Sequence, residues 1–222
     1  MKVIEMGLDI SFYVSGKATR LRKIIKSRRS NNLVESTKLV ICDNVNNSDL
    51  NELLSDHGIT FIEIDYSELK NDKSNSLSDI ILSKFYNYSI DYCFCYGNQI
   101  LKGELLNRYK NKIINFHPSV LPFLKGRNAI DKAIEKGVMI LGNTAHFLTD
   151  KVDGGPIIMQ SLIHANTFSD GGYDKVLDLQ VDMNIQIFNW LSEGRLTFGR
   201  NGEVKVKESD YSTISFYPKL EL

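Results

Sequence analysis

Short apolar segments alternate with helix-like segments along most of this chain, and this alternation restricts its possible folds more than any other feature. Strand-like runs are predicted at residues 10–14, 38–42, 60–64, 91–96, 113–116, 138–147 and 157–164. Helix-like segments are predicted at residues 20–25, 48–57, 76–86, 102–109, 128–136 and 172–193. Strands that alternate with helices of this length indicate an α/β protein with a doubly wound, mostly parallel, Rossmann-like sheet.

The C-terminal region departs from this alternation. The helix-like segment 172–193 carries an apolar stripe at helical spacing, which is typical of a core-facing helix. Segments 196–198 and 204–206 predict a hairpin, because Asn201-Gly202 between them is a strong two-residue turn signal. We therefore expect a main domain over residues 1–200, with a C-terminal strand and tail over residues 201–222 packed on it.

Charge and hydropathy indicate a globular protein with small-molecule ligands. Hydrophobic residues make up 42% of the 222 positions, and the 27 basic residues are balanced by 27 acidic ones. This balance gives no indication of a nucleic-acid or membrane partner. No run approaches the roughly 20 apolar residues that cross a membrane, and no apolar signal segment opens the chain. We expect a cytoplasmic protein whose oligomeric state, a homo-oligomer included, the sequence does not define.

The three cysteines are typical of free core thiols in a reducing compartment. Cys93 and Cys95 lie two apart within an apolar run, a spacing that could also bind a metal. No other cluster of cysteine or histidine supports a metal site, so we expect none.

Three polar residues mark the ends of two strand-like runs. Asn115 and His117 lie two apart at the end of one run, so they point to the same face of a strand. Asp153 follows a second run and precedes Gly154-Gly155-Pro156. A histidine can act as general acid or base, a nearby aspartate can fix its tautomer, and an amide can donate to an oxyanion. This set suits acyl transfer to an external nucleophile, although Asn-x-His alone is more often a capped, hydrogen-bonded turn.

A second candidate site follows the first strand-like run. Ser15-Gly16 lies between that run and a helix-like segment rich in arginine and lysine. Backbone N–H groups at such a turn can hold an anion, and Lys17 or Arg20 would add positive charge. The alternative is an ordinary strand-to-helix turn with a solvated basic helix, because a lone Ser-Gly turn is weak evidence.

Longer motifs in the second half of the chain carry a family resemblance. N-F-H-P-S-V-L-P begins at Asn115, G-R-N-A begins at Gly126, and G-N-T-A-H-F-L-T-D-K-V-D-G-G-P-I-I-M-Q begins at Gly142. Together they resemble the signature of the 10-formyltetrahydrofolate-dependent formyltransferases. The layout is most similar to the glycinamide ribonucleotide formyltransferases. The resemblance implies a formyltransferase with 10-formyltetrahydrofolate as formyl donor, a small-molecule amine as acceptor, and Asn115, His117 and Asp153 as the catalytic trio.

The resemblance also implies roles for residues around the trio. Two loops would bind the folate, and their residues are Gln99, Ile100, Leu101, Leu148, Thr149, Asp150 and Val152. Ile100 and Leu101 are equally well explained as core aliphatics of a turn. Thr144 and His146 would support the trio. The acceptor would be bound by Ser15, Gly16, Lys17, Pro118 and Gln180.

Three positions depart from the glycinamide ribonucleotide enzymes. Ala18 stands in place of a glycine and takes positive φ less easily, so the loop is expected to differ in shape. Asn128 replaces a histidine, and Gln180 replaces a glutamate. Glycinamide ribonucleotide, the acceptor of purine biosynthesis, is favoured by chain length, by the absence of an added tRNA-binding domain and by Ser15-Gly16.

The alternatives differ in the acceptor or in the chemistry. An amino-sugar nucleotide is the second candidate acceptor. Hydrolytic deformylation of the folate is disfavoured because 222 residues leave no room for the regulatory domain that usually precedes that activity. A non-catalytic folate-binding protein is the weakest alternative, because the trio is intact.

Overall fold

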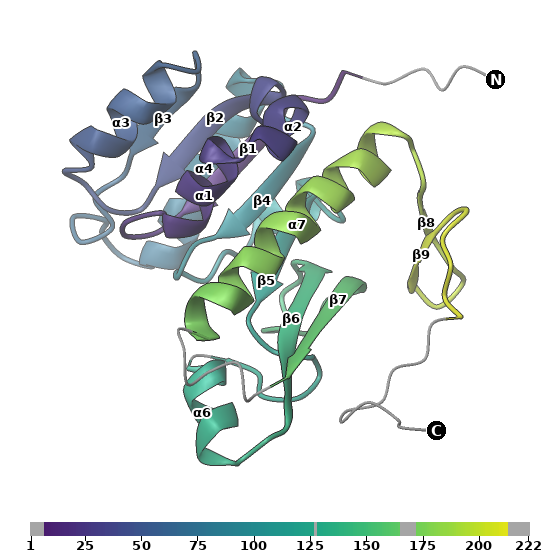
Figure 1. The fold of residues 1–222 in the computed structure, drawn as a ribbon. Helices are drawn as coiled ribbons and strands as arrows, with labels where there is room; N and C mark the ends of the chain where they lie inside the picture. The colour runs from purple at the N-terminus through teal and green to yellow at the C-terminus, as the bar shows by residue number, and fades with distance from the viewer. Residues whose placement is uncertain (1–6, 127, 165–171, 213–222) are drawn as a thin grey trace, which may run out of the picture.

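A computed structural model describes residues 7–126, 128–164 and 172–212 of the chain (Figure 1). Seven strands form one sheet in the order β3-β2-β1-β4-β5-β6-β7. They are β1 (Ile10–Val14), β2 (Thr37–Cys42), β3 (Thr60–Glu63), β4 (Tyr92–Tyr96), β5 (Ile113–His117), β6 (Ile140–Phe147) and β7 (Ile157–His164). The first five are parallel, whereas β6 and β7 are antiparallel to their neighbours. The prediction of a doubly wound, mostly parallel sheet is confirmed.

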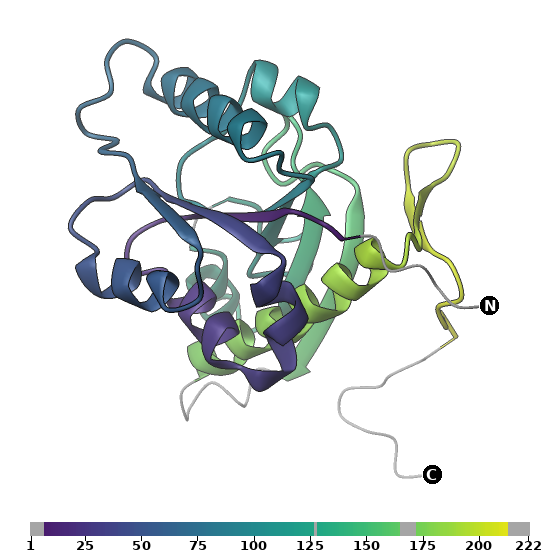
Figure 2. The same ribbon diagram turned by 90° about the horizontal axis from the view of Figure 1, so that it is seen from above.

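Helices cover both faces of this sheet (Figure 2). They are α1 (Thr19–Lys26), α2 (Asn31–Glu35), α3 (Ser48–Ser55), α4 (Lys73–Asn87), α5 (Glu104–Arg108), α6 (Ala129–Glu135) and α7 (Gly172–Ser192), with a 3₁₀ turn at Arg28–Ser30. Helices α4 and α5 lie on one face, and α1 and α7 lie on the other. The segment Arg28–Glu35 was not predicted as helical, because its two short turns leave too few apolar positions to show a helical period.

Alternation along the strands decides which side chains meet which helices. Phe94 of β4 and Ile114 of β5 face the core that includes α1 and α7. Cys93 and Ile113 face the core that includes α4 and α5. Asn115 and His117 are odd-numbered like Ile113, so they lie on the α4 and α5 face of the sheet.

Helix α7 covers the sheet on the α1 face, and it contacts α1 from the first half of the chain and β6 and β7 from the second half. Its buried residues include Met183, Ile187 and Leu191, which confirms the predicted core-facing stripe. Its exposed side carries Asp174, Asp178 and Asp182 at four-residue spacing, so the three carboxylates form one row. Lys23 of α1 pairs with the first two, and Arg29 pairs with the third. These ion pairs are exposed and contribute little free energy. Burial of apolar side chains therefore contributes most of the free energy that holds α7 against α1 and the sheet.

The predicted hairpin consists of β8 (Leu196–Phe198) and β9 (Val204–Val206), which pair antiparallel. Phe198 contacts Phe147 at the end of β6, with ring centroids 5.6 Å apart. The predicted boundary at residue 200 falls in the turn of this hairpin, and residues 213–222 of the predicted tail lie outside the described residues. None of the described helices is long and apolar enough to cross a membrane.

Candidate active site

The three candidate catalytic residues meet at the carboxyl end of β5. Asn115 and His117 of β5 lie opposite His146 and Thr144 of β6 in the antiparallel register. The Asn115 amide Nδ2 lies 3.2 Å from His146 Nε2, and His117 Nδ1 lies 3.5 Å from Asp153 Oδ2. The sheet register therefore brings the predicted trio together and places His146 between two of its members.

Asp153 reaches this cluster from a tight loop between β6 and β7. Its backbone is left-handed, with φ of 48°, and its Oδ2 accepts a 2.7 Å hydrogen bond from the Gly126 N–H. Two residues on, Gly155 lies so close to the Phe147 carbonyl that a Cβ atom would stand 1.8 Å from the oxygen. Only glycine fits there, and this close approach folds the loop back over the strand ends.

The surroundings keep Asp153 ionised. The nearby His146 ring, the Gly126 N–H and the charge of His117 lower the pKa of the Asp153 carboxyl from 3.8 to about 2, against the raising effect of burial. The side chain is 10% exposed. At neutral pH the cluster therefore contains a fixed negative charge beside two imidazoles.

Backbone carbonyls orient both imidazole rings. His146 Nδ1 donates to the Phe147 carbonyl over 3.0 Å, so its Nε2 is free to accept from the Asn115 amide when the ring is neutral. His117 Nε2 donates to the Leu124 carbonyl over 2.9 Å, which directs its Nδ1 to Asp153. No contact in the site was predicted for Leu124 or Gly126, although Gly126 begins the G-R-N-A motif, because both act through backbone atoms.

Thr144 fixes the loop that carries the Leu124 carbonyl. Its Oγ1 accepts from the Leu121 N–H over 2.9 Å and donates to the Ser119 carbonyl over 2.7 Å. Gln160 Nε2 donates to the same hydroxyl and to the Leu121 carbonyl. Thr144 therefore holds the 118–126 loop in place. Its predicted support of the trio stays a prediction.

The predicted folate residues lie in two loops that follow β4 and β6. Gln99 is half-buried, Ile100 is 59% exposed, and Leu101 is buried in the core with α4 and α5. Of the second loop, Leu148 packs partly against that core and Thr149 is half-buried, whereas Asp150 and Val152 are exposed. Ile100 and Val152 thus have exposed apolar side chains, whereas Leu101 belongs to the core. The predicted folate contacts stay predictions. Pro118 is half-buried beside His117.

The predicted acceptor loop lies at the point where the strand order reverses, between β1 and β4. Ser15 donates to the Asp43 carboxylate over 2.6 Å and accepts from the Asn98 N–H over 2.7 Å. Tyr13 donates to the same Asp43 oxygen over 2.7 Å, and the Gly16 N–H donates to the Asn44 side chain. Crevices at such reversal points are the usual ligand sites of open α/β sheets.

Ala18 adopts the left-handed conformation that a glycine would adopt easily, with φ of 50° and ψ of 40°. The backbone at this position therefore keeps the glycine-like turn, whereas a different loop shape was expected from the alanine. The alanine methyl group is buried, so packing offsets part of the conformational cost.

Gln180 lies on α7 and is fully buried. Its Nε2 donates to Asn143 Oδ1 on β6, and Asn143 Nδ2 donates to the Val176 carbonyl and the Ser161 hydroxyl. The amide is thus directed to β6 and is not among the lining residues of the cavity beside Ser15. Its predicted contact with the acceptor stays a prediction. Asn128, at the N-terminus of α6, is exposed and left-handed.

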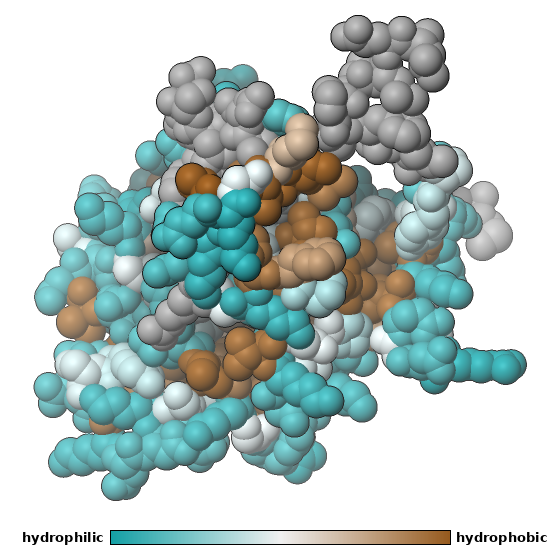
Figure 3. All heavy atoms as spheres, turned by 90° about the horizontal axis from the view of Figure 1, so that it is seen from below, coloured by the Kyte–Doolittle hydropathy of each residue, from teal (hydrophilic) through white to brown (hydrophobic). Residues whose placement is uncertain are grey.

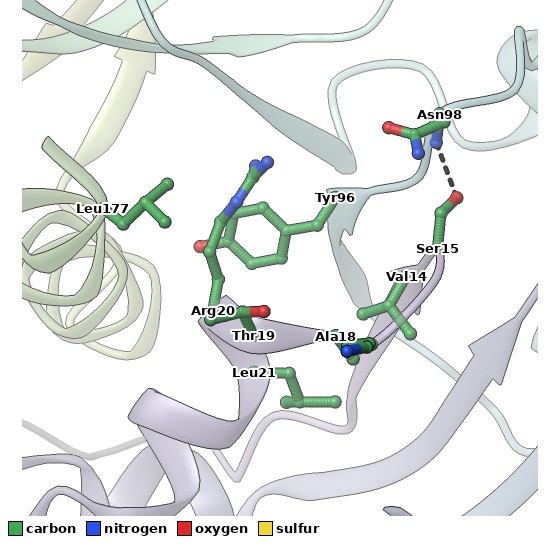
Figure 4. Close-up of a pocket in the computed structure, with 10 residues that line it drawn as sticks. Val14, Ser15, Ala18, Thr19, Arg20, Leu21, Tyr96, Asn98 and Leu177 are labelled. Carbon is green, nitrogen blue, oxygen red and sulfur yellow. Dashed lines mark hydrogen bonds between the residues drawn. The ribbon is translucent and has the colours of Figure 1, made fainter. Parts of the chain in front are cut away.

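A cavity of about 180 Å³ opens beside the acceptor loop (Figure 4). Its walls include Ser15, Lys17, Arg20, Tyr96 and Asn98. Figure 4 shows the Arg20 side chain beside the Tyr96 ring, with Leu177 on its other side. Lys17 and Arg20 are the charged residues among the described residues that line this cavity, and the Asp43 carboxylate lies behind its wall, where it accepts from Ser15.

A second cavity, of about 330 Å³, is apolar and lies next to the 118–126 loop. Phe123 and Ile140 line it and are themselves exposed, as are Ile134 and Met139 nearby in the chain. Seen from below, the molecule shows hydrophobic residues, in brown, between hydrophilic ones, in teal (Figure 3). Among the described residues, no cluster of three or more histidine, cysteine, aspartate or glutamate side chains could hold a metal ion.

Comparison with known proteins defines the family. The sequence profile of the family described as Formyl transferase matches residues 8–180. The chain belongs to this family of formyltransferase enzymes. A phosphoribosylglycinamide formyltransferase from Haemophilus influenzae is 29% identical over 199 residues, which cover 86% of this chain and 91% of that protein. The structure of glycinamide ribonucleotide transformylase 1 from Symbiobacterium toebii superposes with a TM-score of 0.78 at 25% identity, covering 90% of this chain and 94% of that one.

Two other relatives are longer than this chain. The trifunctional purine biosynthetic protein adenosine-3 of Homo sapiens is 33% identical over 156 residues, which cover 69% of this chain and 15% of that protein. A formyltetrahydrofolate deformylase of Haemophilus influenzae is 34% identical over 122 residues, which cover 54% of this chain and 43% of that protein. The chain therefore spans less than half the length of these two relatives.

Proposed function

We propose that this protein transfers the formyl group of 10-formyltetrahydrofolate to a primary amine of a small phosphorylated acceptor, with glycinamide ribonucleotide as the first candidate. The observation that supports it most directly is the cluster of Asn115, His117 and ionised Asp153 at one strand end. The acceptor is favoured by the phosphoribosylglycinamide formyltransferase that aligns along 91% of its own length.

The chemistry assigns a role to each member of the trio. The acceptor amine attacks the formyl carbon, and the bond from that carbon to N10 of the folate breaks. The second N–H of the Asn115 amide and the protonated His117 ring donate to the oxyanion, and each such donor is worth about 3–4 kcal/mol in comparable sites. Asp153 transfers the amine proton to the leaving N10 through a water. Tetrahydrofolate and the formylated amine are the products.

The geometry adds one requirement to this mechanism. His117 Nε2 donates to the Leu124 carbonyl, and Nδ1 faces Asp153. For Nε2 to donate to the formyl oxygen, that oxygen takes the place of the Leu124 carbonyl. Binding of the folate is therefore coupled to a small movement of the 118–126 loop.

Hydrolytic deformylation is the second candidate, because a deformylase is 34% identical over the matched segment. In that reaction water replaces the amine, and formate and tetrahydrofolate are released. Transfer to an amino-sugar nucleotide uses the same trio with a different acceptor. A folate-binding protein without turnover is the remaining alternative.

The test is a turnover assay with 10-formyltetrahydrofolate that follows release of tetrahydrofolate. It is run with glycinamide ribonucleotide, with a set of amino-sugar nucleotides, and without acceptor. We expect turnover with glycinamide ribonucleotide and a loss of at least about a hundredfold in His117→Ala. The exposed His57→Ala is the matched control and keeps its rate. Turnover without acceptor would identify the hydrolase, and full activity of His117→Ala would refute the proposed site.

A further inference from the structure

A buried carboxylate follows β2 at the carboxyl end of the sheet. Asp43 is 2% exposed, and its Oδ2 accepts hydrogen bonds from the hydroxyls of Tyr13, over 2.7 Å, and Ser15, over 2.6 Å. Its other oxygen, Oδ1, is buried and has no hydrogen-bond partner among the described residues. A buried carboxylate with one unpaired oxygen is costly to desolvate, and the proposed mechanism gives it no role. The function of Asp43 therefore lies in its two hydroxyl contacts.

The carboxylate fixes the direction of both hydroxyl groups. A carboxylate accepts hydrogen bonds and cannot donate, so the Ser15 hydroxyl proton points to Asp43 and the lone pairs of the Ser15 oxygen remain for another donor. That donor is the Asn98 N–H, which donates to Ser15 Oγ over 2.7 Å. Burial raises the pKa of the Tyr13 hydroxyl far above its usual range, and the Asp43 charge raises it further, so Tyr13 stays a donor. Asp43 thus determines how Ser15 meets Asn98.

Asn98 lies in the loop that follows β4. We call residues 97–101 the folate loop, because three of the predicted folate residues lie in it. Gly97, at its start, packs so closely on the Tyr13 ring that a Cβ atom would stand 1.9 Å from Cε1. Leu101, at its end, is buried in the core with α4 and α5. The Ser15 contact therefore acts on the short middle part of the loop, between two packed ends.

We propose that Asp43 is a positioning residue for the folate: through the Ser15 hydroxyl it holds the Asn98 amide and keeps the folate loop in the conformation that binds 10-formyltetrahydrofolate. This inference rests on the proposed formyl transfer and adds to it a residue that touches neither the donor nor the reacting atoms. A loop that is ordered before the ligand arrives binds more tightly, because the entropy cost of ordering it is not taken from the binding free energy. Hydrogen bonds to a carboxylate are roughly twice as strong as those between neutral groups, so an amide at position 43 would hold the loop less well.

Amide hydrogen exchange of the free protein tests the positioning role without any turnover. Asp43→Asn keeps the shape of the side chain and removes its charge. We expect the Asn98 amide hydrogen to exchange at least about tenfold faster in this variant, while the amide of Phe94, fully buried in β4, stays within about twofold of wild type. Equal rates at Asn98 in wild type and variant would overturn the inference. Equal acceleration at Asn98 and Phe94 would also overturn it, because it would show a general loss of stability.

A double variant tests whether Asp43 acts through Ser15. Ser15→Ala removes the oxygen that accepts from the Asn98 N–H and leaves the Tyr13 bond to Asp43 in place. It should accelerate exchange at Asn98 at least as much as Asp43→Asn does, and adding Asp43→Asn to it should change that rate by less than about twofold. Multiplication of the two accelerations in the double variant would contradict the route through Ser15.

The matched control is Asp91→Asn. The Asp91 carboxylate accepts from the Asp9 N–H over 3.0 Å, just before β1 and β4 begin, so it joins the same two strands at their opposite end. This variant should keep the wild-type exchange rate at Asn98. Acceleration at Asn98 in Asp91→Asn would contradict the inference, since it would show that loss of any carboxylate along these strands loosens the loop.

Binding of tetrahydrofolate, the reaction product, separates this inference from the proposed function. In calorimetric titration the Kd of Asp43→Asn should be at least about fivefold higher than that of wild type, and Asp91→Asn should match wild type. In turnover with the accepted amine, Asp43→Asn should raise the KM for 10-formyltetrahydrofolate by a similar factor and leave kcat within about threefold.

The two failures are distinguishable. Faster exchange at Asn98 with an unchanged Kd would overturn the role of Asp43 in folate binding and leave the proposed function intact. If the wild type does not bind tetrahydrofolate, the proposed function fails together with the folate part of the inference, and the exchange rates still decide whether Asp43 holds the loop.

Discussion

Replacing Asp153 with asparagine tests the electrostatics of the active site through protein stability. The carboxylate lies near two imidazoles and accepts from the Gly126 N–H, and these contacts lower its pKa from 3.8 to about 2. At about 1.36 kcal/mol per pH unit, this difference corresponds to about 2.5 kcal/mol of folding free energy at pH 7. Because the side chain is only 10% exposed, solvent screening removes little of it. Asp153→Asn is therefore expected to lower the free energy of unfolding by about 2 kcal/mol.

The pH dependence of this loss has a definite sign. A pKa that is lower in the folded state stabilises the protein fully above about pH 5, and the stabilisation falls as the pH drops from about 4 to 2. The difference in free energy of unfolding between wild type and Asp153→Asn, measured by urea unfolding, should therefore be roughly half as large at pH 3 as at pH 7. Asp150→Asn, an exposed carboxylate on the same loop, is the control for stability. Equal stability of Asp153→Asn and wild type at pH 7, or a gap that stays constant down to pH 3, would refute the reasoning.

Two further predictions concern the loops around the site. Ala18→Gly should raise the free energy of unfolding by about 0.5 kcal/mol, because relief of the left-handed conformation, about 1–2 kcal/mol, exceeds the added entropy of the unfolded chain. Urea unfolding checks it, and a destabilised variant would show that the buried methyl group matters more than the backbone. Thr144→Val leaves the Leu121 N–H and the Ser119 carbonyl without their partner, and should cost about 1–3 kcal/mol. In the variant, the Leu121 amide hydrogen should exchange faster with solvent. An unchanged exchange rate would show that Thr144 does not hold this loop in place.

Most of the fold follows from local pattern. Each of the seven strands of the main sheet was predicted within about three residues, because apolar runs bounded by turn residues are visible in any single sequence. The antiparallel pairing of β6 with β5 and with β7 was not predicted, because strand direction depends on how the connecting loops cross the sheet. The short helical turns at Arg28–Glu35 were missed, since they are stabilised by packing more than by local preference.

The sequence by itself indicated the three candidate catalytic residues, through their positions at strand ends and through the family resemblance. Asn115 and His117 lie on the same face of the strand because side chains alternate with a period of two. The two glycines after Asp153 predict a tight loop. The family motif implied that Asp153 lies near His117. In the structure the two side chains are close together, with β5 paired to β6.

Only the tertiary structure decided the environment of these residues. The Leu124 carbonyl and the Gly126 N–H act through backbone atoms, which carry no sequence signature. Gln180 turns toward β6, and Arg20 remains without an acidic partner in the described part of the chain, because α7 places its carboxylates opposite Lys23 and Arg29 instead. The physical reason is common to all four: hydrogen bonds and ion pairs depend on the distances between segments far apart in the chain, and packing of the whole sheet sets those distances.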